Sequence, residues 1–160
     1  MSSMKPELGK PAPNFTAPVI GGEYTEETTL SLTDLKGETV VLVFYPKDNT
    51  PGCTIQGCEM RDEWSELSGM AKIFGISIDS IKSHQKFIDK QNLPYPLIAD
   101  ESKAIVEAYG VWVEKSMFGK TYMGTERSTF IIDPKGNLKA ILQKVSPKKH
   151  LALLKEELLK

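Results

Sequence analysis

The feature that most limits the fold of this chain is a continuous apolar run at residues 40–45, Val-Val-Leu-Val-Phe-Tyr. A run without polar alternation, rich in β-branched and aromatic residues, is typical of a strand that is buried on both faces of a sheet. A second run, Ile-Phe-Gly-Ile-Ser-Ile, occupies residues 73–78. Parallel strands need a crossover connection, and the segment between the runs predicts a helix from about Pro51 to Ser68. We therefore predict a β-α-β unit with the 40–45 strand in a central position.

The pattern after residue 78 continues with alternating helices and strands and then changes to paired strands. We predict a helix over about residues 80–90, a strand over 95–99, a helix over 102–109 ended by Gly110, a hairpin of strands 128–132 and 138–142, and a helix that begins at Ser146-Pro147. Before residue 40, segment 15–19 with Gly21-Gly22 predicts a hairpin, and residues 31–37 predict a capped turn of helix. The first ~14 residues and residues 113–126 lack sustained periodicity and are predicted to be irregular.

A β-α-β half followed by a β-β-α half predicts a thioredoxin-like three-layer α/β/α domain, with a central mixed sheet and an N-terminal hairpin extension. The 160 residues, 40% of them hydrophobic, suit one domain over residues 1–160. Twenty basic against 21 acidic residues, without a basic cluster, predict no nucleic-acid partner. Met1–Pro6 forms no apolar leader, and no stretch approaches the ~20 apolar residues of a membrane span. We therefore expect a cytoplasmic protein without membrane contact.

The chain has two cysteines, Cys53 and Cys58. Two are too few for a secreted disulfide scaffold, and they suit catalysis in a reducing compartment. The two histidines lie far from them, and no CxxC or HExxH pattern is present, so we predict no metal site. Thr50 can cap a helix whose first residue is Pro51, which places Cys53 at the third helical position. Unpaired backbone N–H groups and the helix dipole stabilise a thiolate there, so we predict redox chemistry at Cys53.

The segment Pro46-Lys47-Asp48-Asn49-Thr50-Pro51-Gly52-Cys53-Thr54 resembles the peroxiredoxin active-site pattern Pro-x-x-x-Thr/Ser-x-x-Cys. With Cys58, residues 45–59 are similar to the bacterioferritin comigratory protein, or Q-type, branch of that family, and the likeness extends from Gly9 to Asp133. The resemblance implies reduction of hydrogen peroxide and organic hydroperoxides through a cysteine sulfenic acid. It implies no metal and no organic cofactor.

The resemblance also implies three partners for the Cys53 thiolate. Arg127 would stabilise charge on the sulfur and on the departing oxygen, Thr50 would orient the peroxide, and Pro46 would shield the thiolate. A guanidinium suits the first role because it stays protonated and presents several donors in a fixed fork. Each residue also has an ordinary structural interpretation: Arg127 in a surface ion pair, Thr50 only as a helix cap, and Pro46 only as the end of a strand.

Cys58 determines which peroxide-reducing cycle is possible. Five positions apart in an α-helix, two Cα atoms lie about 8.7 Å from each other, beyond the ~7 Å that a disulfide bridges. The helix must therefore open, and Gly52 and Gly57, each about 1 kcal/mol less favourable than alanine in a helix, make this easier. The residues alone leave two routes equal: Cys58 as the resolving thiol, or an inert Cys58 and an external thiol. The resemblance favours an intramolecular Cys53–Cys58 disulfide that a dithiol such as thioredoxin reduces.

Several residues have two interpretations. Trp112, Phe118 and Tyr122 either roof an apolar pocket for alkyl hydroperoxides or pack as ordinary loop aromatics, and we prefer the second. His84, at a polar helix start, is interpreted as solvated. A disulfide oxidoreductase of thioredoxin type is disfavoured because four residues, rather than two, separate the cysteines. The alternative function is a redox-sensing or holdase-like interaction protein that uses the same disulfide as a switch. We expect a monomer.

Overall fold

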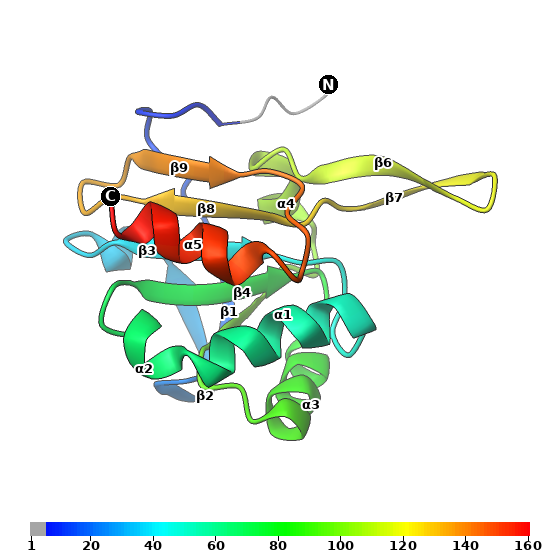
Figure 1. Ribbon diagram of the computed structural model, residues 1–160, viewed down its shortest axis with the longest axis horizontal. Coiled ribbons are helices and arrows are strands. Elements are labelled where there is room, and N and C mark those ends of the chain that lie inside the picture. The colour runs from blue at the N-terminus through cyan, green and yellow to red at the C-terminus, as the bar shows by residue number, and fades with distance from the viewer. Residues whose placement is uncertain (1–5) are drawn as a thin grey trace.

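The centre of the computed structural model, which describes residues 6–160, is a seven-stranded mixed sheet in the order β2-β1-β5-β4-β3-β8-β9 (Figure 1). Its strands are β1 (Thr16–Gly21), β2 (Tyr24–Ser31), β3 (Val40–Phe44), β4 (Lys72–Ser77), β5 (Leu97–Ala99), β8 (Ser128–Ile132) and β9 (Leu138–Leu142). The helices are η1, a 3-10 helix (Leu32–Leu35), α1 (Pro51–Asp62), α2 (Trp64–Leu67), α3 (Ile81–Gln91), α4 (Ala104–Ala108) and α5 (His150–Leu158). Within residues 6–160, no helix has the length and apolar content needed to cross a membrane.

β3 divides the core into two apolar layers. It is buried along its whole length, parallel to β4 on one side and antiparallel to β8 on the other. Val41 and Val43 face a cluster built with α1, α2, α3 and α5, whereas Leu42 and Phe44 face a cluster that includes residues of η1 and α4. Figure 1 shows α1, α2 and α5 in front of the sheet. The predicted three-layer fold with a central mixed sheet is confirmed.

The N-terminal hairpin is also confirmed, and it is part of the main sheet. β1 pairs with β2 and, through Val19 and Ile20, with β5, both antiparallel. The irregular stretch predicted for the first ~14 residues is confirmed for residues 6–14, which contain neither a helix nor a strand. The part of that prediction that concerns residues 1–5 lies outside the described residues.

Two helices differ from their predicted bounds by several residues. The helix predicted from Pro51 to Ser68 is broken at Glu63, which leaves the helical region at φ −110° and ψ 16°. At the break, the Trp64 ring packs against Tyr95, and Lys155 of α5 forms ion pairs with Glu63 and with Glu66 of α2. The last helix begins at His150 instead of Ser146-Pro147, because the chain first makes a turn closed by N–H bonds to the Ser146 carbonyl.

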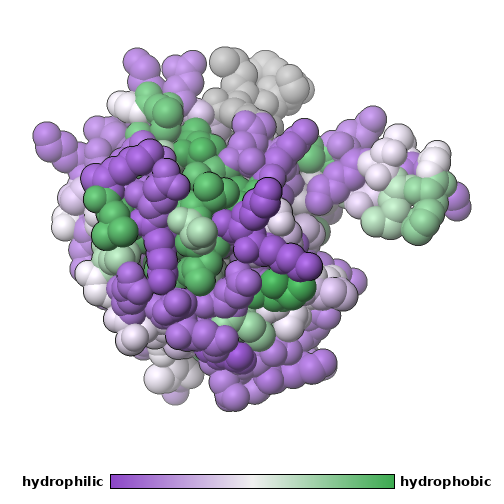
Figure 2. All heavy atoms as spheres, in the orientation of Figure 1, coloured by the Kyte–Doolittle hydropathy of each residue, from purple (hydrophilic) through white to green (hydrophobic). Residues whose placement is uncertain are grey.

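The prediction of an irregular segment over residues 113–126 is wrong. β6 (Trp112–Met117) and β7 (Lys120–Thr125) form a separate antiparallel ribbon, joined by Phe118 and Gly119 at φ 53° and 76°. The ribbon projects from the body of the protein, and Figure 2 shows apolar and pale side chains gathered at its far end. Because most side chains on both faces of the ribbon are exposed, the strands need no alternation of apolar and polar residues, which is the pattern that reveals a half-buried strand.

Phe130 provides a test of the core layer around β3. Its ring is 1% exposed and packs edge-on against Phe44 and Tyr109, with centroids 5.5 and 5.0 Å away. We expect Phe130→Ala to lower the free energy of unfolding by about 3–5 kcal/mol, because it removes buried area and leaves a cavity. The matched control is Phe118→Ala at the 95% exposed ribbon tip, which should change stability by less than about 0.5 kcal/mol. Urea unfolding measures both variants. Similar losses of unfolding free energy in the two would contradict the burial of Phe130 in this core layer.

Candidate active site

Cys53 lies where the chain leaves the sheet and enters its first α-helix. β3 ends at Phe44, and residues 45–50 lead to α1. Thr50 has the extended N-cap conformation and Pro51 is the first helical residue, so Cys53 is the third residue of α1, as predicted. Its side chain is 3% exposed. The thiol therefore sits at the positive end of a helix and is shielded from bulk water.

Arg127 reaches Cys53 from the neighbouring strand. It directly precedes β8, whose register places Ser128 opposite Phe44, so the arginine lies beside the start of the loop to α1. Its Nη2 donates a hydrogen bond to Cys53 Sγ over 3.2 Å. A Cβ on Gly52 would lie only 3.2 Å from the same Nη2, so glycine leaves room for the guanidinium. The structure thus brings together the arginine and the cysteine named from the sequence.

Gln56 is a site residue that the sequence analysis missed. It lies one helical turn after Cys53, and its buried Oε1 accepts a hydrogen bond from Arg127 Nη1. The guanidinium therefore bridges two residues of α1, with one nitrogen on the sulfur and the other on the amide. The spacing was visible in the sequence, because positions i and i+3 share a helix face. What was missing was the knowledge that Arg127 packs on that face.

Thr50 and Pro46 flank the loop that carries the thiol. Thr50 occupies the N-cap position, but its hydroxyl donates to the Lys47 carbonyl over 2.9 Å and makes no capping hydrogen bond to α1. The interpretation of the Thr50 side chain as a helix cap is therefore wrong. Pro46 is half-buried and follows the last buried residue of the strand segment, Tyr45.

Cys58 lies on the same helix as Cys53, and both are free thiols. Its side chain is half-buried, and Sγ lies 3.4 Å from the side-chain oxygen of Gln91, the last residue of α3. Arg61, one turn further along α1, donates to the Gln91 main-chain carbonyl over 2.6 Å. The second cysteine is therefore attached to α3 and not to the site around Arg127.

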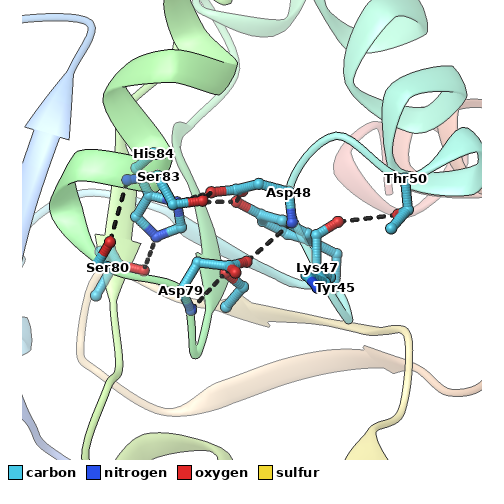
Figure 3. A network of polar contacts seen from close by, with 10 residues as sticks. Tyr45, Lys47, Asp48, Thr50, Asp79, Ser80, Ser83 and His84 are labelled. Carbon is cyan, nitrogen blue, oxygen red and sulfur yellow. Dashed lines mark hydrogen bonds and ion pairs between the residues drawn. The ribbon is translucent and has the colours of Figure 1, made fainter.

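The interpretation of His84 as a solvated residue is wrong. Its side chain is 0% exposed, and it lies between Asp48 of the β3–α1 loop and the Ile98 carbonyl (Figure 3). Polar residues at the start of α3 had suggested a solvent-facing turn. Two of them, Ser83 and His84, contact the buried Asp48 side chain instead. Sequence alone does not distinguish a polar residue that faces water from one that faces a buried partner.

The three aromatic residues before Arg127 lie in different environments. Tyr122 lines an open groove that reaches Arg127, together with Val113, Lys115 and Val145. Trp112 stacks beneath the Lys103 ammonium, and Phe118 points into solvent. Across residues 6–160, no group of three or more His, Cys, Asp or Glu side chains is arranged to hold a metal ion.

His150, the first residue of α5, is a buried neutral imidazole. Its Nε2 lies 2.7 Å from Thr129 Oγ1, and its Nδ1 has no hydrogen-bond partner within the described part of the chain. Burial, reinforced by the positive charge of Arg127, lowers the pKa of His150 to about 4. The ring therefore adds no positive charge to the surroundings of the site at neutral pH.

Comparison with known proteins agrees with this geometry. The sequence matches the AhpC/TSA family over residues 8–141. It is 49% identical over 150 residues to a putative peroxiredoxin bcp of Coxiella burnetii, covering 93% of this chain and 96% of that protein. It is 45% identical over 147 residues to peroxiredoxin Bcp of Bacillus subtilis, covering 91% and 90%. A structure of the Xanthomonas campestris bacterioferritin comigratory protein, described for its alkyl peroxide reduction activity, aligns with a TM-score of 0.84 and 33% identity over 96% of this chain and 98% of that chain.

A thioredoxin-like fold with a buried, arginine-bound thiol at a helix start is the architecture of a thiol peroxidase, and this chain belongs to the AhpC/TSA family. Within that family its relatives are the Bcp and Q-type peroxiredoxins, so the resemblance found in the sequence is confirmed. The protein is a thiol-dependent peroxidase that reduces peroxides at the expense of a thiol reductant.

The neutral state of His150 predicts a specific loss of stability in acid. Because the pKa is lowered on folding from 6.5 to about 4, the unfolded chain binds the proton more readily, so stability falls as the pH falls through this window. The loss amounts to about 3 kcal/mol by pH 4. His150→Gln, whose amide can still reach Thr129, should lose about 3 kcal/mol less than wild type between pH 7 and pH 4. Urea unfolding at several pH values measures this, and equal pH slopes would contradict a buried neutral His150.

Proposed function

We propose that Cys53 is the peroxide-reducing cysteine of this enzyme and that Arg127 is its catalytic partner. The observation that supports both assignments is the 3.2 Å hydrogen bond from Arg127 Nη2 to Cys53 Sγ. Gln56 holds the same guanidinium through its other terminal nitrogen, so the donors are in place before a substrate arrives. Donors fixed in advance near the developing negative charge are the largest common electrostatic contribution to catalysis.

In the first step, the Cys53 thiolate attacks one oxygen of the peroxide. A sulfur–oxygen bond forms while the oxygen–oxygen bond breaks, and the sulfur loses two electrons to the peroxide. The departing oxygen takes up a proton and leaves as water or an alcohol, and Cys53 keeps the other oxygen as a sulfenic acid. In this proposal, Arg127 stabilises the charge that passes from the sulfur to the departing oxygen.

We assign Thr50 and Pro46 supporting roles in this step. The Thr50 hydroxyl already donates its hydrogen to the Lys47 carbonyl, so its oxygen is left as an acceptor for the O–H group of a hydroperoxide. That hydrogen bond would hold the O–H oxygen, which the sulfur takes up, beside Cys53, with the other oxygen pointing away as the leaving group. Pro46 has no N–H group and lies half-buried at the start of the loop, which suits a residue that keeps water from the thiolate.

For the second step, we propose that Cys58 resolves the sulfenic acid. Its thiol condenses with Cys53 to give a disulfide and one molecule of water. The two residues lie five positions apart in a continuous helix, so α1 must unwind for their sulfur atoms to meet. A dithiol reductant, for which thioredoxin is our candidate, then restores both thiols by exchange. An external thiol that attacks Cys53 directly is the competing route.

The relatives, the two free cysteines and the charge also support proposals about the alternative function, the compartment and the partners of the enzyme. Peroxiredoxin relatives favour turnover over the alternative of a redox-sensing or holdase-like switch. Two free cysteines suit a cytoplasmic protein that meets a cellular dithiol. A net charge of −1 and scattered basic residues support a function without a nucleic-acid partner. We also propose a monomer, as the resemblance to the Q-type branch implies.

Serine substitutions distinguish the proposed roles of Cys53 and Cys58. Cys53→Ser should abolish peroxide consumption with a thioredoxin system, because no other group takes over the nucleophile. Cys58→Ser should still react once with stoichiometric peroxide, and mass spectrometry should find one added oxygen at Cys53, whereas wild type loses two hydrogens. Turnover in Cys53→Ser would overturn the first assignment. A disulfide-free wild type, with full turnover in Cys58→Ser, would show that an external thiol resolves Cys53.

Arg127→Lys tests the proposed catalytic role of the arginine. An ammonium keeps the charge but cannot hold Cys53 and Gln56 with one planar fork. We expect kcat/KM for peroxide to fall by about 10²–10³, the usual cost of losing one fixed oxyanion donor. Gln56→Ala, which leaves the guanidinium in place but unanchored, should lose less. Thermal unfolding midpoints identify any variant that has lost its fold, and an Arg127→Lys enzyme within twofold of wild type would exclude a catalytic role for the arginine.

A further inference from the structure

The loop between β3 and α1 is anchored on α3 through a buried polar cluster that the proposed chemistry does not use. Asp48 Oδ2 lies 2.8 Å from His84 Nδ1, and Asp48 Oδ1 accepts from the Tyr45 hydroxyl over 2.6 Å. The Ser83 hydroxyl donates to Oδ2 over 2.8 Å, and the Asp48 N–H donates to the Asp79 carboxylate over 2.8 Å. Figure 3 shows these groups converging on Asp48 from α3 and from the ends of the adjacent strands.

The two contacts of His84 fix one hydrogen on Nε2 and leave one further proton between Nδ1 and Asp48. Nε2 lies 2.9 Å from the Ile98 carbonyl, which can only accept, so Nε2 carries a hydrogen. Nδ1 faces the Asp48 carboxyl group, so one further proton lies between them, on either the ring or the carboxyl group. Both polar ends of a fully buried ring are thereby satisfied. If Asp48 moved away, His84 Nδ1 would keep only the Tyr45 hydroxyl, 3.4 Å away, as a polar neighbour in the core, which is unfavourable.

The same helix holds the far end of the reactive segment. His84 lies near the beginning of α3, whereas Gln91, the last residue of α3, contacts both Cys58 and Arg61. The stretch that must rearrange for a Cys53–Cys58 disulfide therefore lies between two attachments to α3. Asn49, the residue directly after the first attachment, has φ 60° in the left-handed region and marks the point where the chain turns toward α1.

We propose that His84 and Asp48 are positioning residues for the peroxidase reaction. They hold the β3–α1 loop so that Cys53 faces Arg127, and they limit unwinding to the stretch after Asp48. The proposal rests on the proposed roles of Cys53 and Cys58. Peroxide attack needs the anchored conformation, whereas disulfide formation needs the unwound one. Releasing the anchor therefore shifts the population from the first to the second, and the two steps respond in opposite directions.

The test measures both steps in the full-length protein, by rapid quenching and mass spectrometry of Cys53 after mixing with hydrogen peroxide. In His84→Ala and Asp48→Ala, the rate constant for Cys53 oxidation should fall about tenfold, while conversion of the sulfenic acid to the disulfide stays the same or rises. The double variant should oxidise Cys53 no more slowly than either single variant, because the two substitutions remove the same anchor. At a fixed peroxide excess, overoxidation of Cys53 to the sulfinic acid should decrease.

Two milder variants keep the test informative if a buried alanine prevents folding. Tyr45→Phe removes only the hydroxyl that donates to Asp48 and should shift the two steps in the same opposite directions by about two- to fivefold. Asp48→Asn should stay within about threefold of wild type, because an amide can accept from Tyr45 and donate to a neutral His84. Ile132→Val, which weakens the core at the end of the β3–β8 pair far from Phe44 and the loop, is the control and should leave the ratio of the two rates unchanged.

The possible outcomes distinguish a failure of the positioning role from a failure of the proposed function. Equal proportional losses in both steps, or rates within twofold of wild type in both His84→Ala and Tyr45→Phe, would overturn the positioning role. If wild-type Cys53 itself forms neither a sulfenic acid nor a disulfide, the proposed function fails, and the positioning role fails with it. The supporting result is a change in the ratio of the two rates in the anchor variants that is absent from Ile132→Val.

Discussion

The site depends on the antiparallel pairing of β3 with β8. The register that places Phe44 opposite Ser128 also places Arg127 beside the loop to Cys53, although the two residues are 74 positions apart in the chain. The same register stacks Phe44 against Phe130 in the core, with ring centroids 5.5 Å apart. A slip by one residue would turn every side chain of the strand to the opposite face and separate the arginine from the sulfur. Core packing and site geometry are therefore enforced by one interaction.

The helix that carries both cysteines combines two conflicting requirements. It must be formed for Cys53 to meet Arg127, and it must open for Cys58 to reach Cys53. Its glycines serve both requirements: a Cβ on Gly57 would lie 3.0 Å from the Tyr95 hydroxyl, and Gly52 makes room for Arg127. In the sequence, these glycines are visible only as residues of weak helix propensity. The structure adds that close packing requires them, so α1 is held by tertiary contacts rather than by its own stability.

Local patterns predicted what is locally determined. The apolar run at 40–45 identified the central strand, and Thr50-Pro51 identified the helix start and the third-position thiol. Features that depend on distant partners were missed or wrong: the break at Glu63, where Lys155 contacts Glu63 and Glu66, and the burial of His84. The β6–β7 ribbon was missed for a different reason, since a strand pair with both faces in solvent has no hydrophobic period. Gln56 needed the position of Arg127 before its role became visible.

The buried cluster around Asp48 is not explained by stability. Removing a carboxylate and an imidazole from water is costly, and replacing a buried ion pair by apolar residues of similar volume is often neutral or stabilising. Three polar side chains, those of Tyr45, Ser83 and His84, nevertheless converge on Asp48, and the His84–Asp48 pair is almost inaccessible to solvent. Hydrogen bonds differ from apolar contacts in that they fix direction as well as proximity. A loop that must present a thiol within 3.2 Å of a guanidinium needs that direction, because a shift of about one ångström would break the contact and leave the helix intact.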